Sequence, residues 1–142
     1  MGIHEPPRPA GPTRAETPTR IEVRNTSERG RGVFAIDEID AGVVIEDCPV
    51  VVVPAEQVPV IGETVLGSYH FQWGGTSEES AVALGYGSLY NHAHDPNAMY
   101  VKKYEQRIIT FISLRRIAAG EEITVSYNGG IGDDRPVWFE VK

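Results

Sequence analysis

Closely spaced glycines and prolines, 15 and 10 of them in 142 residues, divide this chain into short segments. Many of these segments are rich in β-branched and aromatic residues, as β-strands are. The runs expected to be strands are 20–24, 43–45, 50–53, 69–73, 99–103, 108–112 and 123–127. Helical periodicity is weak, and its best candidates are 55–58, 77–84 and 135–141. The sequence therefore predicts a mainly-β fold with frequent turns.

The length fits one domain. Residues 1–19 hold five of the ten prolines, so we expect a disordered arm there and one domain over 20–142. No run of 18 apolar residues predicts a membrane span, and the first residues lack the apolar core of a secretory signal. The only cysteine, Cys48, excludes a disulfide within the chain and a zinc site of several thiolates. This cysteine usage fits a cytoplasmic location.

The charge balance bears on the kind of partner. Thirteen basic residues against 20 acidic ones give a net charge of −7. Nucleic-acid binders usually carry a basic face, so this balance argues against that class. An acidic surface attracts cationic partners such as lysine-rich protein segments. Negative charge also keeps proteins soluble, which explains the balance equally well.

Three segments carry candidate chemistry. In 27–35, Gly30 and Gly32 would let a backbone approach a ligand closely, or would simply form a turn before a strand. This segment lacks the third glycine and the following helix of a dinucleotide fingerprint. In 119–128, Gly120 begins a turn and Tyr127 ends a strand, where a half-buried core tyrosine would be ordinary.

The third segment, 90–98, concentrates histidines, asparagines and an aspartate around a proline. Imidazoles and carboxylates are good zinc ligands, so a metal hydrolase using His92, His94 and Asp95 is one hypothesis. The other interpretation is a polar loop in which turns around Pro96 satisfy the backbone.

Taken together, the three segments resemble one family in residue type, order and spacing. Gly30-Arg-Gly-Val-Phe-Ala35, Leu89-Tyr-Asn-His-Ala-His-Asp-Pro-Asn97 and Gly120-Glu-Glu-Ile-Thr-Val-Ser-Tyr127 resemble the motifs of the SET-domain protein-lysine methyltransferases. The tail Pro136-Val-Trp-Phe-Glu-Val141 is similar to the C-terminal segment of zinc-free members. The resemblance implies small twisted β-sheets with a C-terminal pseudoknot, and S-adenosylmethionine as the cofactor.

The resemblance also implies which residues hold the cofactor. The backbone of Arg29, Gly30 and Arg31 and the side-chain amide of Asn91 would hold its methionine end. His92 would bond the adenine edge through backbone groups. Trp138 would stack on the adenine ring, or would serve as an ordinary core anchor.

Three tyrosines are candidates for the reaction itself. Tyr127 matches the family's mechanistic tyrosine, which would orient the amine of a lysine in a protein or peptide substrate. Tyr100 would line the lysine channel, as a tyrosine does in a mono-methylating relative. Tyr69 is a further aromatic candidate for the channel, with core packing as its alternative.

The chain also departs from the family pattern. His94 stands where many members have a zinc-binding cysteine, so we expect no metal. The lysine channel would then be closed by 129–142, by a second copy in a homodimer, or not at all. A methyltransferase and a catalytically silent SET-like module that binds cofactor or peptide are both left open, beside the metal hydrolase. Retention of Asn91, His92 and Tyr127 favours the methyltransferase.

Overall fold

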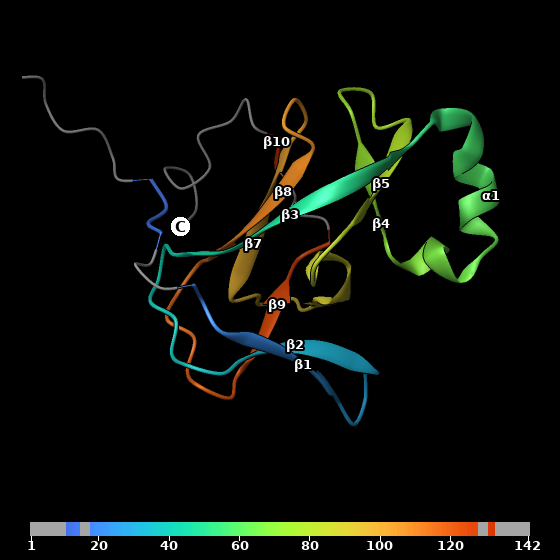
Figure 1. Ribbon diagram of the computed structural model, residues 1–142. Coiled ribbons are helices and arrows are strands. Elements are labelled where there is room, and N and C mark those ends of the chain that lie inside the picture. Colours follow the sequence, from blue (N-terminus) through green and yellow to red (C-terminus); the bar gives the residue numbers. More distant parts are fainter. Residues whose placement is uncertain (1–10, 15–17, 128–130, 133–142) are drawn as a thin grey trace, which may run out of the picture.

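Two curled β-sheets form the computed structural model, which describes residues 11–14, 18–127 and 131–132 (Figure 1). The strand order is β1-β2-β9-β6 in the first sheet and β10-β7-β8-β3-β5-β4 in the second. The strands are β1 (Ile21–Asn25), β2 (Arg31–Ala35), β3 (Val44–Val53), β4 (His70–Trp73), β5 (Glu79–Ala83), β6 (Asn91–His92), β7 (Ala98–Lys103), β8 (Ile108–Ser113), β9 (Glu122–Val125) and β10 (Ile131–Gly132). The expected mainly-β fold is confirmed.

The helices are short and most of them lie in one connection. Between β3 and β4 the chain forms η1 (Ala55–Gln57), α1 (Val58–Gly62) and η2 (Val65–Ser68), at the right edge of Figure 1. A proline in the first turn of α1 favours a helix there, as expected from the sequence. The remaining helix, η3 (Gly87–Leu89), follows β5. Within the described parts of the chain, no helix is long and apolar enough to cross a membrane.

β3 joins two stretches that the sequence predicts as separate strands. Its first half pairs with β8 as far as Pro49, opposite Ile108, and its second half pairs with β5 from Val50, opposite Ala83. Proline has no backbone N–H to donate to a ladder. The strand tolerates Pro49 because this residue stands where the strand changes partner.

The predicted helix over 77–84 is wrong. Residues Glu79–Ala83 form β5, which pairs with β3 on one side and with β4 on the other. Ala81 and Ala83 are buried in the core beneath these neighbours, where small side chains fit. Pairing on both sides outweighs the helix propensity of alanine. The helix expected over 135–141 and the segment that would form a pseudoknot lie outside the described residues.

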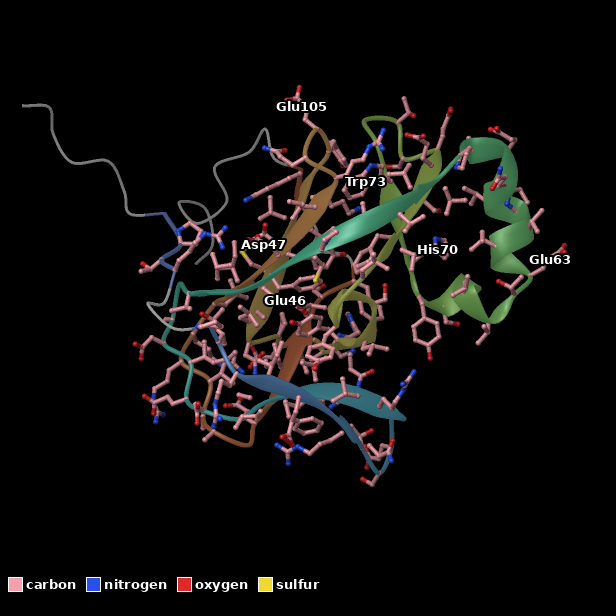
Figure 2. The ribbon with its side chains drawn as sticks, in the orientation of Figure 1. Glu46, Asp47, Glu63, His70, Trp73 and Glu105 are labelled. Atoms are coloured by element: carbon pink, nitrogen blue, oxygen red, sulfur yellow. The ribbon has the colours of Figure 1, made fainter. Side chains whose placement is uncertain are left out.

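One buried cluster connects the two sheets. Tyr90 and Phe111 stack at its centre with ring centroids 4.4 Å apart. The Tyr90 hydroxyl donates to a carboxylate oxygen of Glu46 at 2.7 Å, and Glu46 lies between the two sheets in Figure 2. Burial, reinforced by this carboxylate, raises the pKa of Tyr90 well above its usual value. The buried phenol therefore stays protonated and remains a hydrogen-bond donor.

Part of the proline-rich N-terminal segment lies against this scaffold. Thr13 donates its N–H to the carbonyl of Gly42 at 2.8 Å and accepts from the N–H of Val44 at 2.9 Å. Arg14 pairs with Asp47 at 2.7 Å. Thr13 and Arg14 thus have partners on the β3 side of the fold.

A substitution at Gly87 would test how tightly the core is packed beside η3. A Cβ there would lie 2.6 Å from the Cβ of Ala83 and 2.9 Å from the Sγ of Cys48. We expect Gly87→Ala to destabilise the fold by about 1–3 kcal/mol. That loss lowers the Tm by about 3–9 °C in a thermal unfolding scan. Gly75→Ala is the control, because nothing lies within 4 Å of a Cβ there. Equal Tm values for the two variants would contradict this packing.

Candidate active site

A short parallel pairing brings the second and third motifs together. β6 runs beside β9, with Asn91 opposite Thr124 and His92 opposite Val125. Just beyond β9, the backbone N–H of Tyr127 donates to Nδ1 of His92 at 3.1 Å, and the two rings lie 5.2 Å apart. Residues 35 positions apart in the sequence therefore meet at one place.

The side chain of Asn97 also holds the backbone of β9 in place. Its side chain is almost completely buried and pairs with the strand as a neighbouring backbone would. Its Oδ1 accepts from the Thr124 N–H at 2.8 Å, and its Nδ2 donates to the Glu122 carbonyl at 2.8 Å. These bonds explain why an asparagine ends the second motif.

Glu122 links the first motif to the second through its carboxylate. One oxygen accepts from Nη2 of Arg29 and the other from Nδ2 of Asn91, both at 2.7 Å. Asn91 also donates to the carbonyl of Arg31 at 3.0 Å, and Arg29 to that of His92 at 3.0 Å. Both amide hydrogens of Asn91 are used in these bonds, which leaves its Oδ1 as an acceptor.

The two glycines of the first motif are needed for different structural reasons. Gly30 adopts a φ of +71°, the left-handed region that favours glycine, and a Cβ there would meet nothing within 4 Å. At Gly32 a Cβ would lie 2.4 Å from Oε2 of Glu122 and 2.8 Å from Nδ2 of Asn91. Gly30 therefore makes the turn, and Gly32 lets Glu122 and Asn91 approach β2.

A cavity of about 530 Å³ lies beside this cluster. Tyr69, Tyr100 and Tyr127 all line it, as do His70 and Lys102. The rings of Phe71 on β4 and Tyr100 on β7 pack edge to face, with centroids 5.2 Å apart. Curling of the second sheet thus brings its β4 edge against β7 and encloses the cavity.

Hydrogen bonds hold the tyrosines at the cavity wall. The Tyr127 hydroxyl donates to the carbonyl of Tyr90 at 2.8 Å, and the Tyr100 hydroxyl donates to the carbonyl of Tyr127 at 3.0 Å. Burial raises the pKa of the Tyr127 phenol. It is therefore neutral at physiological pH and orients other groups by hydrogen bonding, because a protonated phenol is not a general base.

A larger cavity, of about 700 Å³, lies elsewhere on the molecule. It is lined by residues that include Arg14, Arg20, Ile45 and Glu46. None of the three motifs supplies a residue to it. Size alone is therefore a poor guide here, and the smaller cavity is the candidate site because Tyr90, Val125 and Tyr127 of the second and third motifs line it.

The described residues offer little support for the hypothesis of a metal site at His92, His94 and Asp95. No group of three His, Cys, Asp or Glu residues there could hold a metal ion. The rings of His92 and His94 lie edge to face with centroids 5.4 Å apart. Asp95 is 94% exposed at its side chain and lies 3.5 Å from Arg115. Elemental composition of the purified protein tests this hypothesis directly.

The structure therefore brings together most of the site residues expected from the sequence. Tyr69, Tyr100 and Tyr127 share the cavity, and Arg29, Gly30, Arg31, Asn91 and His92 lie around the Glu122 cluster. Trp138 lies outside the described residues. Sequence reasoning missed Glu122 as a positioning residue. The glutamate pair of the third motif was the available signal for Glu122.

Comparisons with known proteins agree with this geometry. The family model for the SET domain matches residues 30–128. A histone-lysine N-methyltransferase of Schizosaccharomyces pombe, described as specific for lysine 37 of histone H3, is 37% identical over 121 residues, which cover 84% of this chain and 77% of that protein. A crystal structure of a candidate histone methyltransferase from Plasmodium falciparum superposes with a TM-score of 0.63 at 28% identity, covering 86% of this chain and 98% of that one.

These matches settle the class of protein. A model that covers residues 30–128 and a relative at this level of identity show that the chain belongs to the SET-domain family. Members of this family use S-adenosylmethionine as the methyl donor.

Proposed function

We propose that this chain transfers the methyl group of S-adenosylmethionine to the side-chain amine of a lysine in a protein. The observation that carries this function is the position of Tyr127. Its backbone N–H donates to His92, which belongs with Arg29, Asn91 and Glu122 to the polar cluster. Its side chain lines the cavity of about 530 Å³. A methyl donor on one side and an amine on the other would therefore meet at this residue.

The polar cluster suits the methionine end of the cofactor. That end carries an ammonium and a carboxylate, which need acceptors and cationic donors respectively. Asn91 offers its free Oδ1 as an acceptor, and the guanidinium of Arg29 supplies positive charge. Arg31 adds a second cation, exposed beside Gly30 and without an ion-pair partner among the described residues. These residues would hold the cofactor, which supplies a methyl group on a positively charged sulfur.

The cavity suits the incoming lysine. Its walls include four tyrosines, a phenylalanine and a valine. Removing an ammonium from water lowers its pKa, and the reacting lysine must be neutral to attack a methyl carbon. When the new N–C bond forms, the C–S bond breaks and its electron pair stays on sulfur. The amine's proton is released to water, so the protein needs no strong base.

Tyr127 and Tyr100 would align the amine within this cavity. The Tyr127 hydroxyl is fixed to the Tyr90 carbonyl, and Tyr90 is in turn held by Glu46. The Tyr100 hydroxyl donates to the Tyr127 carbonyl at 3.0 Å, which fixes the Tyr100 ring beside Tyr127. Holding both reactants in a fixed geometry contributes strongly to rates of displacement reactions.

Transfer of tritium from labelled S-adenosylmethionine to protein tests the proposed function. Because the yeast relative is described as acting on histone H3, that histone belongs in the substrate panel with lysine-containing peptides. Calorimetric titration with the cofactor is run in parallel. Binding followed by transfer supports the enzyme, whereas binding without transfer over the whole panel supports a catalytically silent module instead.

A further inference from the structure

One lysine in the candidate cavity has no role in the proposed chemistry. In β7 (Ala98–Lys103), alternate side chains point to the same face, so Lys102 follows Tyr100 on the face that lines the cavity. Its neighbour Lys103 points to the opposite face and is not part of the lining. Lys102 therefore belongs to the wall of the cavity where a substrate lysine would enter.

Lys102 is the only residue with a full positive charge in the described lining, and no carboxylate lines the cavity. This local charge contrasts with the net charge of −7 of the whole chain. Lys102 is half-buried, and no carboxylate within the described residues forms an ion pair with it. Burial lowers the pKa of its ammonium.

A second residue of the lining has an unsatisfied polar atom. His70 stands on β4, where Figure 2 labels it, and its buried Nδ1 has no hydrogen-bond partner among the described residues. A partly buried ammonium with no counter-ion among the described residues is costly, and a carboxylate that enters the cavity would offset that cost.

We infer that Lys102 determines substrate specificity, by favouring an aspartate or glutamate close to the methylated lysine and disfavouring lysine or arginine there. This inference rests on the proposed function. Two residues of a strand span roughly 7 Å, which sets the distance of Lys102 from Tyr100 along β7. A carboxylate within about three residues of the target would therefore be in reach, since an extended peptide advances roughly 3.3 Å per residue.

The test uses peptides with one central lysine in an alanine–glycine background. Each position within three residues of that lysine is set in turn to Glu, Gln or Lys. All peptides are acetylated and amidated at their ends, and a matched peptide with a free C-terminal carboxylate separates a terminal from a side-chain carboxylate. Methyl transfer is measured by mass spectrometry. Peptide Kd is measured by fluorescence anisotropy with S-adenosylhomocysteine present.

We expect the best Glu peptide to exceed its Gln counterpart by about fivefold in kcat/KM or affinity, and its Lys counterpart by more, because like charges repel at contact. Lys102→Met should bring the Glu and Gln peptides level, Lys102→Arg should keep the preference, and Lys102→Glu should invert it toward Lys. Lys103→Met is the matched control, because it removes the neighbouring charge on the other face and should keep the preference.

The outcomes separate the two proposals. Transfer at equal rates to Glu and Lys peptides overturns the inference and leaves the methyltransferase intact. A preference that survives Lys102→Met also overturns it. If no peptide is methylated, the proposed function is in doubt and the Kd values decide the inference alone: a Glu preference lost in Lys102→Met supports it. Absence of binding to every peptide overturns it.

Discussion

Tyr127→Phe should lower the rate of methyl transfer by about 10²-fold or more, the usual scale for removing an orienting polar group from a reacting centre. The Kd for S-adenosylmethionine should stay nearly unchanged. The variant keeps the ring and the backbone N–H that bonds His92, and it removes only the hydroxyl that donates to the Tyr90 carbonyl. The loss should therefore fall on kcat under saturating cofactor.

The matched control is Tyr86→Phe. Tyr86 is 36% exposed and lines the larger cavity, to which none of the three motifs contributes a residue. Its loss of a hydroxyl should leave turnover within about twofold, as is usual for surface changes away from a site. Wild-type turnover in Tyr127→Phe would remove Tyr127 from the reaction and return it to a packing role.

Gly32→Ala should weaken cofactor binding by tenfold or more, roughly 1.4 kcal/mol. The new Cβ would lie 2.4 Å from Oε2 of Glu122 and 2.8 Å from Nδ2 of Asn91, so both side chains must move. That movement breaks the bridge which holds Arg29 and Asn91 in place. Titration calorimetry measures the change in Kd.

A control separates this effect from a general loss of stability. Gly62→Ala adds the same methyl group where nothing lies within 4 Å of it, at the end of α1. We expect it to bind the cofactor as the wild type does. Gly32→Ala protein that unfolds at the wild-type Tm and binds the cofactor normally would show that the Glu122 bridge is not needed for binding.

The elements that could be predicted from the sequence are those whose structure is determined by their local residue pattern. The hairpin of β7 and β8 was predicted from two strand-like runs that flank a polar link, and the short helix after β3 was among the helical candidates. The prediction failed for elements whose structure depends on pairing with strands distant in the sequence. Residues Glu79–Ala83 are a strand because β3 and β4 flank them, and β3 continues through Pro49 because the strand changes partner there.

In the candidate site, too, some residues could be predicted from the sequence and others depended on long-range contacts. Motif residues such as Asn91, His92 and Tyr127 were predictable because their order and spacing resemble a family. Glu122 was not, because its role depends on the missing Cβ of Gly32 and on two partners far away in the sequence. The wall position of Lys102 likewise required the curling of the sheet, which no local pattern encodes.

The most direct measurement of the central claim is the site of methyl transfer. Cell lysate is incubated with the purified protein and isotope-labelled S-adenosylmethionine, and the labelled residues are mapped by tandem mass spectrometry. We expect label on the Nε of lysine, lost when Tyr127→Phe replaces the wild type. Cofactor binding with no labelled lysine, or label on another kind of residue, would contradict it.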